Sequence, residues 1–489
     1  MTDLDHRSQR IAKLEQLREQ GIDPYPARVY YTHTAAEALA AFEAREGEEG
    51  PHVQVVGRMV SQRIMGRSSF AHLADGSGKI QIYVRQDVVG EESYHLFRRM
   101  TDLGDFLEAE GDLFRTRTGE ITVRVSSLRL IAKALRPMPE KWHGLRDVET
   151  RYRQRYLDLM ANENVRQIFL TRSRMVAAIR RFLDDRGFIE VETPILQPIY
   201  GGAAARPFVT HHNALDQRLY LRIADELYLK RLIIGGLDRV YEIGHNFRNE
   251  GISTKHNPEF TLIEIYQAYA DYHDIMDLVE ELYSEVAREV LGSDSVTYQG
   301  ETIDLSPPWR RITMRDAILD ATGLDIAELS DYAALWRATQ EQELSVGPQP
   351  SWGKLVDALF GEHVEPKLVQ PTSVLDYPRE ISPLAKNKPG DPDWVERFEY
   401  FIAGMESGNA FSELNDPLEQ RSRFAEQGRA IQAGDEEAHP MDEDFLTALE
   451  HGMPPTGGLG FGIDRMAMLF TDQTSIREVI LFPQLRSID

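Results

Sequence analysis

A glycine-rich run near residue 460 constrains the fold of this chain more than any other feature of its sequence. It reads Gly458-Leu459-Gly460-Phe461-Gly462 and is followed by Asp464 and Arg465. Its spacing is not Gly-x-Gly-x-x-Gly, and no strand–helix–strand pattern surrounds it, so it does not favour a dinucleotide-binding turn. Glycines at alternate positions instead predict a strand whose backbone approaches a flat ligand. Arg465 is then expected at the start of a helix.

A second motif lies far upstream and complements the first. It reads Phe247-Arg248-Asn249-Glu250-Gly251, and a polar stretch from Lys255 to Phe260 follows closely. Residues alternate in character over 238–248 and 258–269, which predicts a long antiparallel hairpin. The arginine on this hairpin and Arg465 beyond the glycine strand form a two-pronged clamp that suits a polyphosphate.

The faces of the predicted hairpin also indicate a polar ligand. Polar and aromatic groups on the inner face of a sheet are costly unless a polar ligand covers them. An alternative is that Arg248 and Glu264 form a structural ion pair, but this leaves Phe260, Tyr266 and the glycine-rich strand unexplained. The residues that share these faces are Glu242, Gly244, Asn246 and Arg248 on the first strand and Phe260, Leu262, Glu264 and Tyr266 on the second.

Composition limits the class of protein. The chain has 489 residues, of which 42% are hydrophobic, so we expect about two to four globular domains. The absence of cysteine excludes disulfides, cysteine-ligated zinc and a thiol nucleophile. The sequence shows no apolar run of membrane-spanning length and no signal-peptide core, so we expect a soluble, cytoplasmic protein without a membrane partner. The net charge of −24 argues against indiscriminate nucleic-acid binding but permits a local binding face.

The first part of the chain is expected to form a small β-barrel. Residues 1–50 contain a charged helix and are interpreted as an N-terminal helical extension. Residues 51–135 contain five strand-like runs, with a helical stretch at 92–103 before the fourth, which is typical of a Greek-key barrel of the OB type. The five predicted strands cover 53–60, 68–73, 79–84, 106–115 and 120–130.

One outer face of this barrel is a candidate for binding unpaired bases. Alternation places Phe70, His72, Gln81 and Tyr83 outside and the apolar residues between them inside. Residues 55–135 carry twelve Lys or Arg and ten Asp or Glu, a small basic excess within an acidic chain. Aromatic and amide groups beside basic residues suit the stacking and reading of bases. The alternative, which the sequence leaves open, is that Phe70 only caps the barrel core beneath a loop.

The second part of the chain predicts a larger domain. Residues 136–163 are interpreted as a linker rich in proline and arginine, and residues 164–489 as the domain itself. A helix over about 164–186 leads into a strand at 188–193 that ends at a proline. A largely helical segment, 312–365, interrupts the strands as an insertion. This arrangement predicts an α+β fold with an antiparallel sheet and flanking helices.

Two carboxylates further along the chain are candidates for a metal site. Glu399 and Glu406 are seven residues apart, which puts them on opposite faces of an unbroken strand. To bind one ion together they need a turn or a bulge between them, and Ala403-Gly404 is where it would fall. Carboxylates without histidine or cysteine, beside a polyphosphate, favour Mg²⁺.

These motifs resemble those of class II lysyl-tRNA synthetases of the bacterial type, over essentially the full length of the chain. The three general motifs are the helix and strand ending at Pro194, the Phe247–Glu250 run with its hairpin, and the Gly458–Arg465 run. The features that resemble lysine enzymes in particular are the runs Gly201–Phe208, Glu226–Arg231 and Asn409–Asp416.

The resemblance implies both a fold and a reaction. An OB-type anticodon-binding domain would precede a class II catalytic domain. The enzyme would use ATP and Mg²⁺ to ligate L-lysine to tRNA(Lys) through a lysyl-adenylate, releasing AMP and diphosphate. The alternatives are a synthetase for another polar amino acid and a catalytically idle tRNA-binding or regulatory paralogue. The residues whose presence together favours an active enzyme are Arg248, Glu250, Glu399, Glu406 and Arg465.

The resemblance also implies roles for single residues. Arg248 and Arg465 would be catalytic, with Arg248 on the α-phosphate. The other nucleotide contacts would come from His256 on the outer phosphates, Phe260 and Asn257 on adenine, and Glu250 on its amino edge, with Glu399 and Glu406 holding Mg²⁺. Lysine would contact Gly202, Glu226, Glu264, Tyr266, Asn409, Phe411 and Glu413. The anticodon would contact Arg63, Phe70, Gln81 and Glu120.

The chemistry of lysine agrees with part of this assignment. A desolvated ε-ammonium needs carboxylate acceptors, which Glu226 and Glu413 could provide. A synthetase for aspartate on the same fold would need a cation there.

The family uses the 164–194 element at a two-fold interface, so the resemblance also implies a homodimer. The alternative is that the apolar stripe of this helix packs only within its own subunit.

Overall fold

The computed structural model describes residues 3–45, 47, 49–139, 145–432, 434 and 438–487. Residues 140–144 of the predicted linker therefore lie outside the described residues. The chain divides into two compact units, Met1–Arg146 and Asp147–Asp489, which are treated separately here.

The first unit contains the predicted five-stranded barrel. Its strands close in the order β1-β2-β3-β5-β4, which confirms the OB-type fold. The barrel core is formed by the inward residues that alternation predicts, including Ala71, Leu73, Ile80 and Ile82. The elements are α1 (Asp3–Glu19), α2 (Ala35–Glu43), β1 (Glu49–Met65), β2 (Ser68–Ala74), β3 (Lys79–Arg85), α3 (Gln86–Val89), α4 (Glu91–His95), a π-helical turn (Leu96–Met100), β4 (Phe106–Arg115) and β5 (Ile121–Ala132).

The helical stretch between the third and fourth strands differs from its prediction at 92–103. It begins earlier, at Gln86, and ends at Met100. It is also interrupted, because Gly90 has a φ of 87° and separates α3 from α4. A residue at positive φ cannot continue a right-handed helix, so the stretch forms short pieces.

The second unit is built around a large mixed sheet in the order β14-β15-β17-β18-β19-β11-β10-β6. All neighbours are antiparallel except the edge pairs β14–β15 and β10–β6. Its strands are β6 (Ile189–Glu190), β10 (Arg239–Phe247), β11 (Glu259–Ala268), β14 (Arg310–Thr313), β15 (Thr372–Pro378), β17 (Asp391–Ile402), β18 (Met405–Ser412) and β19 (Thr456–Gly462), with β16 (Asn387–Lys388) beside β17. Smaller sheets join β7 (Leu196–Gln197), β8 (Val209–His212) and β9 (Gln217–Leu221), and β12 (Ser295–Tyr298) and β13 (Glu301–Asp304).

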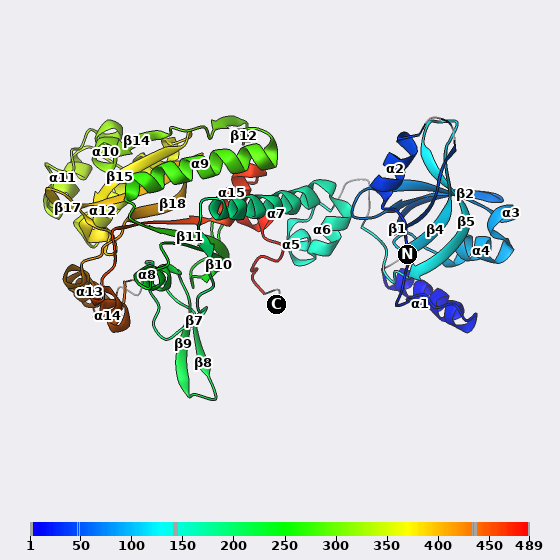
Figure 1. Ribbon diagram of the computed structural model, residues 1–489, viewed down its shortest axis with the longest axis horizontal. Coiled ribbons are helices and arrows are strands. Elements are labelled where there is room, and N and C mark those ends of the chain that lie inside the picture. The colour runs from blue at the N-terminus through cyan, green and yellow to red at the C-terminus, as the bar shows by residue number, and fades with distance from the viewer. Residues whose placement is uncertain are drawn as a thin grey trace. The chain divides into compact units, whose positions relative to one another are not determined.

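Helices pack on both faces of the large sheet. On one face, α7 (Glu163–Asp184) and α9 (Tyr272–Leu291) run side by side, as Figure 1 shows, and bury the main apolar core together with α15 (Ile463–Phe470). The opposite face carries α8 (Glu226–Ile234), α13 (Pro417–Gln432) and α14 (Glu443–Glu450). The remaining helices are α5 (Val148–Arg153), α6 (Arg155–Ala161), α10 (Met314–Thr322), α11 (Tyr332–Glu341), α12 (Trp352–His363) and α16 (Ile476–Val479).

The apolar stripe of α7 packs within its own chain. Ile168, Ile179, Phe182 and Leu183 belong to the same buried core as α9. The stripe therefore gives no support by itself for an interface between subunits. The strand predicted at 188–193 is also shorter than expected, since only Ile189 and Glu190 pair with β10.

Two helices lie where the sequence predicts a linker. α5 and α6 form because their arginines find partners in the second unit: Arg151 is paired with Glu478, and Arg155 is fully buried against Asp158. Arg155 also donates to the carbonyl oxygen of Arg477 at 2.7 Å. In the described part of the chain, no helix is both long and apolar enough to cross a membrane.

Candidate active site

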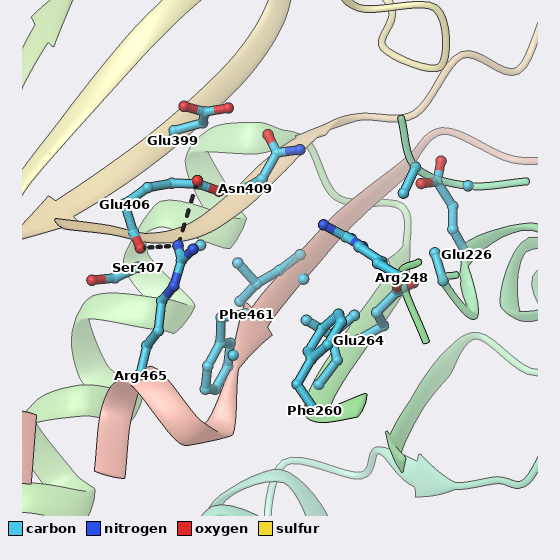
Figure 2. Close-up of a pocket in the computed structure, with 18 of the residues that line it drawn as sticks. Glu226, Arg248, Phe260, Glu264, Glu399, Glu406, Ser407, Asn409, Phe461 and Arg465 are labelled. Atoms are coloured by element: carbon cyan, nitrogen blue, oxygen red, sulfur yellow. Dashed lines mark hydrogen bonds and ion pairs between the residues drawn. The ribbon is translucent and has the colours of Figure 1, made fainter. Parts of the chain in front are cut away.

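A cavity of about 470 Å³ opens over the central strands of the large sheet. Figure 2 shows Glu399, Glu406 and Arg465 toward one end, Glu226 toward the other, and Arg248 between them. The register of the strands determines which residues meet on the floor of the cavity. Gly458 of β19 lies between Tyr266 and Phe411 on the neighbouring strands. Two residues further on, Gly460 lies between Glu264 and Asn409. Segments far apart in sequence therefore meet along one face.

The glycines of β19 have different neighbours. A methyl carbon added at Gly458 would lie 1.9 Å from Glu413 Oε1 and 2.6 Å from Tyr266 Cε1, so protein side chains already fill that space. At Gly460 the nearest atom, in Glu264, would be 3.6 Å away. Gly458 is therefore required by packing within the protein, whereas Gly460 leaves open space over the backbone. This arrangement agrees with the strand that the sequence predicts here, because the backbone at Gly460 faces the open space of the cavity.

Arg248 lines the cavity as a half-buried cation. Its Nε atom has no hydrogen-bond partner among the described residues, and its guanidinium carbon lies 5.2 Å from the centre of the Phe260 ring. Burial lowers the pKa of Arg248, although a guanidinium remains charged. The alternative ion pair with Glu264 is not formed within the described structure. A cation with a buried donor that lacks a partner favours an anionic ligand.

Arg465 lies in the first turn of α15, as predicted, and faces the same cavity. It donates to the backbone carbonyl of Glu406 and lies 3.4 Å from the Glu406 carboxylate. The two arginines thus approach the cavity from β10 and from the helix after β19, which is the clamp that the sequence predicts.

The loop after β10 holds the other predicted nucleotide contacts. Partial burial lowers the pKa of the His256 imidazole, and the nearby Arg465 adds to the shift. Its Nδ1 lies 2.9 Å from Ser253 Oγ. Asn257 is buried and accepts from the Gln484 backbone at 3.2 Å, which ties its amide to the loop framework. Glu250 is exposed at the mouth of the cavity.

The turn predicted between Glu399 and Glu406 is present. Ala403 and Gly404 both have positive φ, 54° and 68°, and join β17 to β18 as a tight hairpin. The register also shifts between Tyr400 and Phe401. This irregularity brings both carboxylates to the lining of the cavity, although they are an odd number of residues apart.

The two carboxylates differ in charge state. Burial raises the pKa of Glu399 to about 7, with Glu406 adding to the shift and Arg397 opposing it. Burial also acts to raise the pKa of Glu406, but Arg465, Arg248 and Arg397 outweigh it and the net direction is downward. Glu399 accepts from Tyr377 at 3.0 Å and is paired with Arg397.

These carboxylates fit Mg²⁺ better than a metal that needs a complete protein cage. No group of three or more His, Cys, Asp or Glu side chains within the described residues could hold a metal ion. Mg²⁺ commonly takes only one or two carboxylates and completes its shell with substrate phosphates and water. A cation beside Glu399 would favour the ionised form of this carboxylate, whose pKa burial raises.

The other end of the cavity is lined by Glu226 and Glu413, the residues predicted to receive an ammonium. Both are buried, and both are paired with Lys230 of α8. Lys230 Nζ lies 2.6 Å from Glu226 Oε1 and 5.5 Å from the centre of the Phe411 ring. The sequence analysis did not identify Lys230, although its spacing of four from Glu226 on a helix places the two on one face.

The remaining predicted lysine contacts lie between these groups. Tyr266 donates to Glu264 at 3.0 Å, and burial raises the pKa of Glu264 well above its usual range, with Asp225 and Glu226 adding to the shift. Gly202 has a φ of 88°, and a methyl carbon there would lie 3.0 Å from Glu226 Cβ. All seven predicted residues line the cavity: Gly202, Glu226, Glu264, Tyr266, Asn409, Phe411 and Glu413.

Arg397 is a second residue that sequence reasoning missed. It donates to Asn409 Oδ1 at 2.9 Å and is paired with Glu399, so it connects the two ends of the cavity. Its position two residues before Glu399 places both on one strand face, which is the signal that could have identified it.

The four predicted anticodon contacts lie together on the outer face of the barrel. Arg63 is opposite Phe70 in the β1–β2 register, and Phe70 stacks on Tyr83 with ring centres 4.5 Å apart. Gln81 donates to Glu120 at 2.7 Å. Phe70 thus lies on the outer face rather than inside the barrel, while its part in binding bases stays a prediction.

Comparisons with known proteins agree with this architecture. The family described as tRNA synthetases class II (D, K and N) matches residues 147–486, and the OB-fold nucleic acid binding domain matches residues 53–131. The lysine–tRNA ligase of Roseiflexus castenholzii is 58% identical over 98% of this chain and 98% of its own. This chain belongs to the class II lysine–tRNA ligase family. The family member from Bacillus subtilis is 52% identical over 99% of this chain and 97% of its own.

Family membership confirms the resemblance inferred from the motifs. Similarity also favours lysine over another polar amino acid at the level of the family. The class II description covers D, K and N enzymes, whereas the similar full-length proteins are lysine–tRNA ligases. Similarity to these proteins does not decide the roles of single residues in the cavity.

Proposed function

We propose that this chain ligates L-lysine to tRNA(Lys) with ATP through a lysyl-adenylate, releasing AMP and diphosphate. The observation that carries the proposal is a cavity with a half-buried arginine, Arg248, whose Nε has no hydrogen-bond partner among the described residues, and two buried carboxylates, Glu226 and Glu413, at one end. The cations suit the phosphates of ATP and the carboxylates suit the lysine side chain.

Amino-acid-dependent exchange of diphosphate into ATP tests this function directly. Exchange supported by lysine and by no other standard amino acid is the expected result. Exchange with another polar amino acid would favour a different specificity on the same fold, and no exchange with any amino acid would favour an idle paralogue.

The first step requires no nucleophile from the protein. An oxygen of the lysine carboxylate attacks the α-phosphorus in line, a new P–O bond forms, and the bond to the bridging oxygen breaks as diphosphate leaves. Arg248 would stabilise the charge that develops on the α-phosphate, while Arg465 and His256 would hold the outer phosphates. In the second step, a ribose hydroxyl of the tRNA attacks the lysyl carbonyl carbon and AMP leaves.

The proposed nucleotide and metal contacts complete this arrangement. Phe260 and Asn257 would hold the adenine, with Glu250 at its amino edge. Glu399 and Glu406 would hold Mg²⁺, which when bound neutralises negative charge on the phosphates. The pairing of Glu406 with Arg465 supports a shared site for metal and phosphate. Because tRNA is charged in the cytoplasm, we expect this enzyme to be cytoplasmic.

The outer face of the barrel is proposed to bind the anticodon through Arg63, Phe70, Gln81 and Glu120. Phe70→Ala should weaken charging of tRNA by about 1–3 kcal/mol, because a base would lose its aromatic stacking partner. Adenylate formation, measured by diphosphate exchange, should stay near the wild-type rate. Parallel loss of both activities would show that Phe70 supports the fold instead.

We further propose that the active species is a homodimer in which the 164–194 segment takes part. Two large apolar side chains that are exposed on this segment, Leu170 and Ile189, support this proposal. Ile189→Glu should yield a less active monomer, measured by sedimentation velocity and diphosphate exchange, because an isologous interface would bury the charge twice. Leu319→Glu, at an exposed position on α10, is the matched control. A wild-type chain that sediments as a fully active monomer would contradict the proposal.

A further inference from the structure

Lys230 lies behind the lysine end of the cavity. Glu226 and Glu413 line the cavity, whereas the Lys230 side chain is fully buried and its ammonium is bonded to both carboxylates. The closest atoms to its Nζ are Glu226 Oε1 and Glu413 Oε2. Lys230 itself does not line the cavity, so its ammonium reaches the two carboxylates from within the protein.

We propose that Lys230 is a positioning residue that orients Glu226 and Glu413 and cancels one of their two charges, so that the pair accepts a single side-chain ammonium. This inference rests on the proposed lysine ligase function and adds a determinant of its specificity.

Electrostatics explains why an internal cation is needed. Two carboxylates buried side by side repel each other, and one of them would take up a proton. Burial and this repulsion raise the pKa of Glu413, and Lys230 opposes the shift. Lys230 lowers the pKa of both carboxylates against the effect of burial. When both are ionised, the two carboxylates and Lys230 together carry one negative charge in excess, which matches one ammonium of the substrate.

Among the residues that the structure describes, no other cation around the two carboxylates takes this role. His439 lies near Lys230, but burial and the Lys230 charge lower its pKa to about 4, so it is neutral at pH 7. Arg397 acts on Glu226 only as a weaker, more distant charge, since its own partners are Glu399 and Asn409. The titratable and charged groups around this site are Glu226, Glu264, Tyr266, Arg397, Glu413 and His439.

The test is diphosphate exchange by full-length Lys230→Met, which keeps the length of the side chain and removes its charge. The lysine KM should rise roughly tenfold or more, because a buried pair has lost one partner, while the ATP KM should stay near wild type. The ratio of variant to wild-type lysine KM should also fall from about pH 6 to about pH 8, as the shared proton leaves the carboxylates. Lys230→Gln is a second variant should the first not fold.

Two further variants separate charge cancellation from a purely structural role. In Lys230→Met/Glu413→Gln the remaining carboxylate again gives the site one negative charge in excess, so the lysine KM should be lower than in Glu413→Gln alone, where Lys230 neutralises Glu226. Lys388→Met is the matched control, because Lys388 is paired with Asp376 outside the cavity. Equal rises in lysine KM and ATP KM, or a variant-to-wild-type ratio that does not change with pH, would overturn the inference. Wild-type enzyme without lysine-dependent exchange would instead contradict the proposed function.

Discussion

Arg248→Ala should lower the kcat/KM of lysine-dependent diphosphate exchange by roughly 10²–10³-fold. Its guanidinium is already desolvated and underpaired within the cavity, so it is organised to meet negative charge without rearrangement. Loss of one such donor from a transition state typically has an effect of about this size. Steady-state exchange kinetics with ATP and lysine varied in turn would measure the change.

Arg248→Lys is the informative companion variant. It retains the charge but not the planar fork of donors, so its activity should lie between those of the alanine variant and the wild type. If Arg248→Ala retained wild-type exchange, the cavity would bind its anion elsewhere. Thermal unfolding of both variants would show whether a loss of activity reflects a loss of folded protein.

Glu226→Gln should weaken lysine binding by about 2–5 kcal/mol while ATP binding changes little. The carboxylate is buried at the end of the cavity, so an ammonium brought there without it would lack a charged acceptor. Separate measurements of lysine and ATP affinity by calorimetry would distinguish the two effects.

Glu280→Gln provides a matched control for this prediction. Glu280 is also buried, but it accepts from the Trp309 backbone at 3.1 Å and from Arg311 at 3.2 Å, away from the cavity. Its replacement should reduce the free energy of unfolding and leave lysine affinity intact. Equal losses of lysine and ATP affinity in Glu226→Gln would mean that Glu226 supports the fold instead of reading the side chain.

Features with strong local signals were predictable from the sequence. The hairpin of β10 and β11 follows from two-residue alternation, and its pairing of Gly244 with Leu262 puts the predicted faces together. The turn at Ala403-Gly404 could be inferred because two carboxylates with one proposed ligand require it. The barrel strands were similarly clear, since inward and outward residues alternate.

Features that depend on distant contacts were not predictable in the same way. The apolar stripe of α7 has the same periodicity whether it packs on α9 or on another subunit, and only the fold shows that it packs on α9. Arg155 looks like an ordinary linker residue until its carbonyl partners near the C-terminus are seen. Lys230 has a local signal in its spacing from Glu226, but its second partner, Glu413, is 183 residues away in sequence.

The floor of the cavity has a consequence for how substrate choice can change over evolution. Residues on one face of a strand recur every two positions, or roughly 7 Å, so Gly458 and Gly460 are successive residues on the face of β19 that lines the cavity. Side chains beside Gly458 can be exchanged without displacing those beside Gly460. The family description that groups D, K and N enzymes fits this independence. Both glycines lie beside proposed lysine contacts, so selection for a new amino acid can act at either position and leave Arg248 and Arg465 unchanged.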